Sequence, residues 1–139
     1  MDPTRFQGLG MASAVAQVND VLAPLLVGKD PVNQEEVDDA MNELDGTDDK
    51  SSLGTHAILS VSMAVCRAGA GQKDMPLYRH IAELTGQSDL VLPVPSITAL
   101  SGGCHAPNKL PMQEFSIMPV GAASFQEALE WGHKVRRGT

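Results

Sequence analysis

The sequence predicts a mixed α/β chain that is mostly helical over residues 1–88 and contains two strands and a last helix over residues 89–139. Apolar residues recur every three or four positions through most of the first part, the spacing of an amphipathic helix. From Asp89 the sequence turns to β-branched and proline-rich segments, which favour strands and extended connections. At 139 residues the chain suits one ordinary domain and is too short for a closed eight-stranded barrel of about 250 residues.

The first two helices are predicted between residues 11 and 46. The first has an apolar face at spacings of four, three and four residues, formed by Met11, Val15, Val18 and Leu22. Pro24 is expected to disturb or end this helix, because proline lacks the N–H that an interior turn needs. Asn33 followed by Glu36 resembles a capping box, so a second helix is predicted to start there and to stop at Gly46.

The third and fourth helices are predicted on either side of residue 75. The third, Thr55–Gly69, carries almost no charge, so we expect it to be the most enclosed helix. Its buried positions are predicted to be Ile58, Val61, Ala64 and Val65. Pro76 suits the first turn of a fourth helix that ends near Gly86. The apolar face of that helix is formed by Leu77, Ile81 and Leu84. His56 and His80 lie in helical patterns and are predicted to be boundary residues rather than ligands.

The last third of the chain predicts a hairpin followed by a helix. Residues 90–95 are apolar but carry two prolines, which is typical of an edge strand or an extended linker. Residues 96–100 are predicted to form a strand that leads into the Gly102-Gly103 turn, and residues 113–118 a second strand. The segment from Ser124 to Glu127 is a capping box that opens the last helix.

Composition and charge exclude several functional classes. The net charge of −7 argues against non-specific nucleic-acid binding, which needs a basic surface. No apolar stretch approaches the roughly 20 residues of a transmembrane helix, and the first residues lack the apolar core of a signal peptide. Cys66 and Cys104 are too few for a disulfide framework and are predicted to be reduced thiols. We therefore expect a cytoplasmic protein without membrane or nucleic-acid partners.

Three segments that resemble part of a metal-binding or dinucleotide-binding motif lack other features that the motif requires. Residues 30–49 hold nine of the 17 acidic side chains and predict a solvated helix face, since the segment from Asp45 lacks the alternating ligands of an EF-hand. Cys104-His105 has no further cysteine or histidine at zinc-ligand spacing. Gly8-Leu9-Gly10 lacks the preceding strand of a dinucleotide-binding turn. No metal ligand is assigned within the chain.

One segment combines the residues that proton chemistry needs. Residues 102–109 form a glycine-rich turn that presents His105. Gln113 and Glu114 follow eight and nine residues later, at the start of an apolar strand. A histidine on a glycine-hinged loop near a carboxylate at a strand end can handle a proton or bind an oxyanion. A surface histidine and a solvated glutamate explain the same pattern, and both interpretations stay open at this point.

Residues 102–115 resemble the signature of the enolase family around its substrate-loop histidine. Further blocks resemble enolases in the same order and spacing: Leu44-Asp45-Gly46-Thr47, His56-Ala57-Ile58-Leu59, Val65-Cys66-Arg67-Ala68-Gly69, Pro76-Leu77-Tyr78-Arg79-His80-Ile81, Leu92-Pro93-Val94-Pro95 and Met118-Pro119-Val120-Gly121-Ala122. The resemblance covers nearly the whole chain, and so many ordered blocks make it specific.

Enolases interconvert 2-phosphoglycerate and phosphoenolpyruvate by a Mg²⁺-dependent dehydration in glycolysis, and they form homodimers. The resemblance implies that residues 1–88 are the helical part of the N-terminal domain. It implies that residues 89–139 are the linker and the first strands and helix of an enolase-type α/β barrel, with the two strands antiparallel. It also implies that His105 contacts the substrate phosphate, that Glu114 is an active-site carboxylate that meets substrate, and that Gln113 supports it.

The family's lysine base and magnesium carboxylates have no counterpart in the 139 residues. We therefore expect an internal piece of an enolase that is inactive alone. A non-catalytic, diverged enolase-like product that acts as a protein-binding module is the alternative. Ser101, Cys104 and Pro107 depart from the family pattern, and Pro107 is expected to stiffen a loop that has to close.

Overall fold

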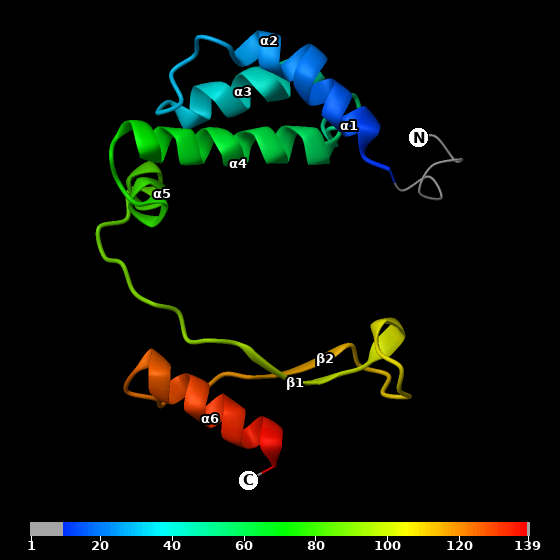
Figure 1. Ribbon diagram of the computed structural model, residues 1–139, viewed down its shortest axis with the longest axis vertical. Coiled ribbons are helices and arrows are strands. Elements are labelled where there is room, and N and C mark those ends of the chain that lie inside the picture. The colour runs from blue at the N-terminus through cyan, green and yellow to red at the C-terminus, as the bar shows by residue number, and fades with distance from the viewer. Residues whose placement is uncertain (1–9, 139) are drawn as a thin grey trace. The chain divides into compact units, whose positions relative to one another are not determined.

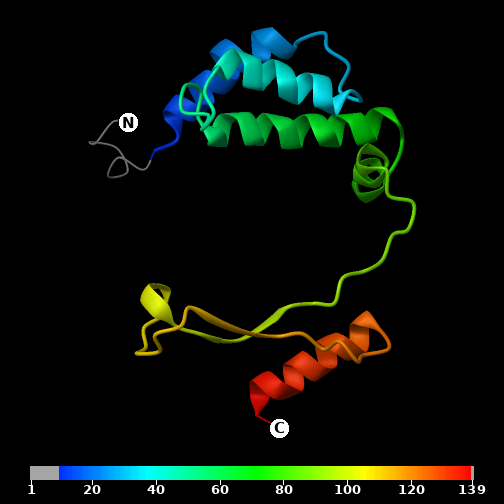
Figure 2. The ribbon, with the colours of Figure 1, turned by 180° about the vertical axis from the view of Figure 1, so that it is seen from behind.

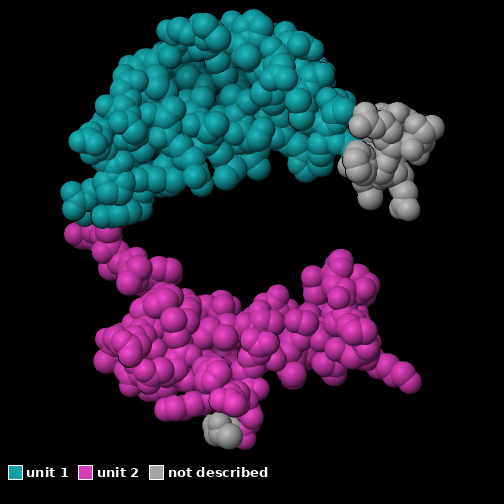
Figure 3. Space-filling view, in the orientation of Figure 1, with its two compact units in different colours: residues 1–88 teal, residues 89–139 magenta. Residues whose placement is uncertain are grey.

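The computed structural model describes residues 10–138. The chain forms two compact units, residues 1–88 and residues 89–139 (Figure 3). The elements of the first unit are α1 (Ala12–Ala16), η2 (Gln17–Leu22), α2 (Ala23–Leu26), α3 (Gln34–Asp45), α4 (Thr55–Gln72) and α5 (Leu77–Thr85). Those of the second are β1 (Ile97–Ser101), η3 (Gly103–His105), β2 (Glu114–Ile117) and α6 (Phe125–Arg137). The predicted α/β class and the order of its elements are confirmed. The Gly8-Leu9-Gly10 motif lies almost wholly outside the described residues.

Pro24 widens the first helical stretch and does not end it. α1, η2 and α2 follow one another without a break, and the helix ends at Leu26, two residues after the proline. The residues of η2 form π-helical turns, in which each N–H reaches the fifth residue back. Proline clashes with the carbonyl four residues earlier, which belongs here to Asp20, and the wider turns around Asp20 relieve that clash.

Both ends of α3 agree with the prediction, but the predicted capping box does not form. Gly46 ends the helix in the left-handed conformation at φ +69°, where glycine has no steric penalty. Within residues 10–138 the Asn33 side chain accepts no hydrogen bond from the helix, so the predicted capping box is wrong. Nζ of Lys29 instead donates to the Glu36 carboxylate at 2.9 Å. This ion pair occupies the carboxylate that a capping box requires.

Asp45, the last residue of α3, closes the turn that follows. Its buried carboxylate accepts hydrogen bonds from the Thr47 hydroxyl, from the Leu53 N–H at 2.7 Å and from the Thr47 N–H at 3.1 Å. These bonds favour the charged form, the Thr47 hydroxyl most of all, and they lower the pKa of Asp45 below its usual value of 3.8. The carboxylate therefore acts as a hydrogen-bond acceptor that holds the turn.

We expect Asp45→Asn to lower the midpoint of urea unfolding at neutral pH, because an amide cannot replace all three acceptor bonds of the charged group. The folded-state pKa is depressed, so the stability that Asp45 contributes is present above pH 3.8 and lost as the pH falls through the folded value. Wild type should thus lose stability more steeply in acid than the variant. Circular dichroism measures both midpoints, with exposed Asp39→Asn on the same helix as control. Equal neutral-pH midpoints for wild type and Asp45→Asn would contradict this role.

α4 packs against α1, η2, α3 and α5, and Figures 1 and 2 both show α3 lying alongside it. The buried core consists of Leu22, Val37, Met41, Ala57 and Ile58. Of the positions predicted to be buried in this helix, Ile58 belongs to the core, two valines are half-buried and Ala64 is exposed. Leu59 and Met63 are also exposed. The prediction that this helix is enclosed is therefore wrong for one of its faces.

α5 buries only part of its apolar side and encloses a histidine. Its start after Pro76 is confirmed, and of its apolar residues Leu77 is half-buried while Ile81 and Leu84 are exposed. His80 is completely buried. It packs against Gly69 of α4, where an added β-carbon would lie 2.8 Å from Nε2 of the imidazole. The prediction of a boundary histidine is wrong, because the missing side chain of Gly69 leaves room for the ring in the interior.

The second unit is built on the antiparallel hairpin of β1 and β2. The paired residues are Ile97 and Ile117, Thr98 and Ser116, Leu100 and Phe115, and Ser101 and Glu114. Between Thr98 and Ser101 the first strand advances three residues while the second advances two, so β1 contains a β-bulge. Both predicted strands are confirmed, as is their antiparallel pairing. Residues 90–95 form no strand and are the extended linker of the two alternatives.

α6 packs on β1 and begins at the predicted Ser124 cap, with the return bond of the capping box made to Ala123, one residue before the cap. The Ser124 hydroxyl accepts a hydrogen bond from the Glu127 N–H at 3.1 Å, and the Glu127 carboxylate accepts one from the Ala123 N–H at 2.7 Å. Further along the helix Gly132 is buried against the side chain of Ile97. A β-carbon at Gly132 would overlap that side chain, so the glycine allows the helix to lie close to the strand that carries the candidate site.

Candidate functional site

The residues predicted to carry chemistry lie on the loop that joins β1 to β2. Two backbone hydrogen bonds close this loop at its base, from the Gly102 N–H to the Gln113 carbonyl and from the Gly103 N–H to the Leu110 carbonyl, both at 2.8 Å. The side chain of Asn108 ties the loop further, donating to the Ser101 carbonyl at 2.8 Å. The loop is thus an internally bonded unit held between the ends of two paired strands.

The two glycines of the loop are needed for close packing. Gly102 is buried, and a β-carbon on it would overlap the Met112 carbonyl and the side chain of Leu110. Gly103 has φ +68°, and its backbone lies against Gln113. The sequence predicts that the glycines form a hinge for His105. In the structure they also let the beginning of the loop lie close against its end.

His105 ends the short helix η3 and is exposed to solvent. The residue after it, Ala106, has φ −123° and ψ 144°, the extended conformation that a following proline imposes. Pro107 therefore fixes the direction in which the chain leaves η3. The loop presents the imidazole at the surface of the second unit, where a ligand in solution can reach it.

Glu114 is the first residue of β2, and two hydroxyl groups hold its side chain. Oε1 accepts hydrogen bonds from Oγ1 of Thr98 at 2.7 Å and from Oγ of Ser116 at 2.8 Å. These bonds, the one from Thr98 first, lower the pKa of Glu114 below its ordinary value. Thr98 and Ser116 were not among the residues predicted from sequence. The signal for Ser116 is its place two residues after Glu114, on the same face of the strand.

The structure brings the loop base and the start of β2 together, but it does not join the predicted side chains to one another. In the described part of the chain no hydrogen bond or ion pair connects His105 with Gln113 or Glu114. Gln113 contributes its backbone carbonyl to the loop closure, and its side chain is exposed. His105 and Glu114 are therefore two separate polar groups near the two ends of one closed loop, and both are exposed to solvent.

The donor set does not fit a magnesium site within residues 10–138. No three histidine, cysteine, aspartate or glutamate side chains gather there in a way that could hold a metal ion. Oε1 of Glu114 is already occupied by two hydroxyl donors. Cys66 is half-buried and Cys104 exposed, and both thiols are free. The described residues by themselves therefore support no step that passes through a bound metal.

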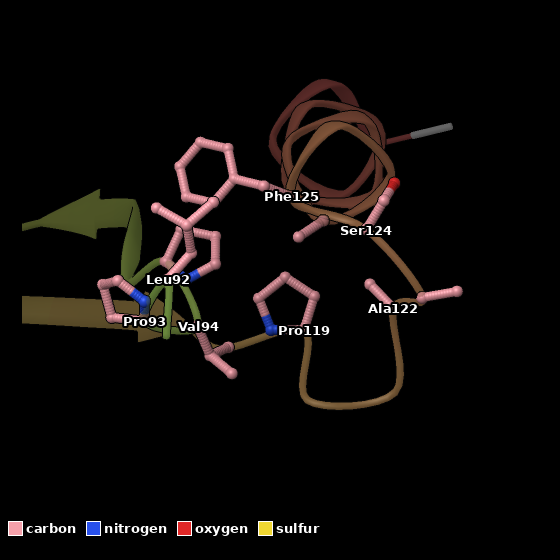
Figure 4. Close-up of a pocket in the computed structure, with 10 residues that line it drawn as sticks. Leu92, Pro93, Val94, Pro119, Ala122, Ser124 and Phe125 are labelled. Atoms are coloured by element: carbon pink, nitrogen blue, oxygen red, sulfur yellow. The ribbon is translucent and has the colours of Figure 1, made fainter. Parts of the chain in front are cut away.

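A shallow cavity of about 200 Å³ lies elsewhere in the second unit (Figure 4). Its walls are the linker residues Leu92, Pro93 and Val94, together with Pro119 and the residues at the start of α6. Figure 4 shows Phe125 and Ser124, at the start of α6, among the residues that line it. None of His105, Gln113 and Glu114 lines this cavity, and its apolar walls offer no titratable side chain. It is not part of the candidate site.

Comparison with protein families assigns both parts of the chain. Residues 1–81 match the model of the enolase N-terminal domain, and residues 89–138 match the model of the enolase C-terminal TIM barrel domain. Among the described residues, no helix is both long enough and apolar enough to cross a membrane. The two matches follow one another in the order that the sequence blocks predict and together cover most of the 139 residues. The chain belongs to the enolase family.

Proposed function

We propose that this chain contributes part of an enolase active site, which dehydrates 2-phosphoglycerate to phosphoenolpyruvate in the cytoplasm as a step of glycolysis. The observation that carries the proposal is the closed loop between β1 and β2, which presents exposed His105 at one end and Glu114 at the other. Both groups suit an anionic, phosphorylated substrate: one can donate to an oxyanion and the other can accept a proton or a hydrogen bond. The reaction class is that of a carbon–oxygen lyase.

Each residue has a distinct task in this proposal. His105 donates a hydrogen bond to a substrate phosphate oxygen, a bond that the negative charge of the phosphate strengthens. Glu114 acts as an anion that meets the substrate and supports proton transfer, and Gln113 positions it through the loop base. Magnesium supplies the positive charge that stabilises an enolate in this kind of chemistry. We place the magnesium ligands and the base outside residues 10–138.

The proposal assigns the two parts of the chain to the two enolase domains. Residues 1–88 would be the helical part of the N-terminal domain. Residues 89–139 would be the linker and the first strands and helix of the barrel. The hairpin and α6 would then join further strands of an eight-stranded barrel, which would cover the apolar side chains that the second unit exposes. A homodimer is the proposed assembly.

A chimera tests this function directly. Residues 89–138 replace the matching segment of a complete, active enolase, and formation of phosphoenolpyruvate is followed by absorbance with excess Mg²⁺. We expect turnover, because the segment supplies the loop histidine and the glutamate. The 139-residue chain alone is expected to show none, because its described residues gather no metal-binding set. A folded chimera that binds Mg²⁺ like its parent but does not turn over would contradict the proposal.

A second candidate function is a non-catalytic protein-binding module. The observation in its favour is the exposed apolar face of α4, where Leu59 and Met63 are more than half exposed. An inactive but folded chimera would remove the enzymatic candidate and leave the binding module. Turnover in the chimera favours the enzyme.

A further inference from the structure

Two hydroxyl groups converge on one oxygen of Glu114. Thr98 and Ser116 each donate their single hydroxyl proton to Oε1, at 2.7 and 2.8 Å. Among the described residues, Oε2 receives no hydrogen bond. The carboxylate is thus tethered through one oxygen, while its second oxygen is free to act on a ligand.

The β-bulge in β1 creates this arrangement. Ser101 lies opposite Glu114, and Thr98 lies opposite Ser116. In a regular ladder without the extra residue, Ala99 would lie opposite Ser116, and Thr98 would face the other side of the sheet. The bulge therefore brings Thr98 to the face of the hairpin that carries Glu114.

Two donors on one carboxylate oxygen stabilise its charged form. The pKa of Glu114 is lowered by the Thr98 bond first and the Ser116 bond second, against a smaller opposing effect of burial, and no charged neighbour is among the causes. A glutamate held in this way is an acceptor at neutral pH and a poor proton donor.

We propose that Thr98 and Ser116 are positioning residues that keep Glu114 an anion with Oε1 occupied, and that Oε2 is the oxygen that acts on the substrate. This inference rests on the proposed function, because it assigns the role of Glu114 within the same site. It restricts that role to accepting a proton or a hydrogen bond.

The test is the pKa of the Glu114 carboxyl, measured by ¹³C NMR titration of the full 139-residue chain without metal or substrate. We expect Thr98→Val and Ser116→Ala each to raise this pKa, and the double variant to raise it further. Thr98→Ser retains a hydroxyl and should restore the low value. Cross-strand contacts between β1 and β2 in the same spectra show that the hairpin is intact in each variant.

Ser101→Ala is the matched control. Ser101 lies directly opposite Glu114, but its hydroxyl is not one of the groups bonded to the carboxylate. Its removal should leave the Glu114 pKa unchanged. An ordinary Glu114 pKa in the wild-type chain, or an unchanged value in the double variant, would overturn the positioning role without affecting the chimera result. An inactive chimera with a low Glu114 pKa would refute the proposed function and leave the hydroxyl tether standing.

Discussion

Replacing His105 by alanine in the chimera is expected to lower kcat/KM for 2-phosphoglycerate by tenfold to a hundredfold. A hydrogen bond between charged partners contributes about 1.5–3 kcal/mol net, and about 1.4 kcal/mol corresponds to a factor of ten. The loss would exceed this range if the loop also fails to close. Steady-state kinetics at saturating Mg²⁺ measure the effect. A rise in KM alone would show that the phosphate contact is equally strong in the ground state, whereas a fall in kcat would show that it strengthens in the transition state.

His133→Ala provides the control for this experiment. His133 is an exposed histidine of α6 in the same unit, and its Nε2 lies 3.5 Å from Nη1 of Arg137. The same substitution there should leave kcat/KM at the level of the unaltered chimera. Unchanged kinetics in the His105→Ala chimera would return His105 to the status of an ordinary surface residue.

Local signals in the sequence predict helix ends well, because a single residue decides them. Gly46 and Gly86 both end their helices with φ near +70°, a conformation that glycine adopts without strain. The cap at Ser124 forms as expected, since its hydroxyl accepts from the Glu127 N–H, and the Glu127 carboxylate bonds back to the Ala123 N–H. The capping box at Asn33 fails because Lys29 takes the carboxylate of Glu36. Whether Lys29 reaches Glu36 depends on the path of the loop that precedes α3.

Burial within the helical unit is harder to predict, because it depends on which faces meet. The apolar pattern of α5 selects Ile81 and Leu84, yet both are exposed and the side chain that packs against Gly69 of α4 is that of His80. The reason lies in α4, where Gly69 offers space for a ring. The spacing of apolar residues identifies the amphipathic face of a helix, but it does not indicate where the neighbouring helix leaves space for a side chain.

The candidate site shows the same division between local and non-local information. His105 and Glu114 could be singled out from the glycine pair and from the resemblance to the enolase family. Thr98 could not, because alternation along a regular strand places it on the opposite face from the residue that pairs with Glu114. The bulge brings Thr98 to the face that carries Glu114, and β1 contains no glycine or proline that would indicate a bulge in the sequence. The tether of Glu114 is therefore visible only in the folded hairpin.

The Gly69→Ala substitution is expected to destabilise the first unit by about 1–3 kcal/mol, the range for adding atoms to a packed interior. A β-carbon at Gly69 would lie 2.5 Å from the Pro31 carbonyl oxygen and 2.8 Å from Nε2 of His80. The carbonyl belongs to the backbone and cannot rotate away, so α4 or the loop that contains Pro31 has to move. Thermal unfolding followed by circular dichroism measures the effect, which should be a fall of roughly 4–8 °C in Tm for each kcal/mol.

Gly71→Ala is the matched control, since it makes the same chemical change two residues further along the same helix. No other atom lies within 4 Å of a β-carbon at Gly71, so the change adds no clash among the described residues. Alanine in a helix is favoured over glycine by roughly 0.5–1 kcal/mol, so this variant should be slightly more stable than wild type. The two substitutions are thus expected to have opposite signs. If both substitutions raise Tm, the close contacts of Gly69 with His80 and Pro31 do not prevent a larger side chain at this position, and the prediction is wrong.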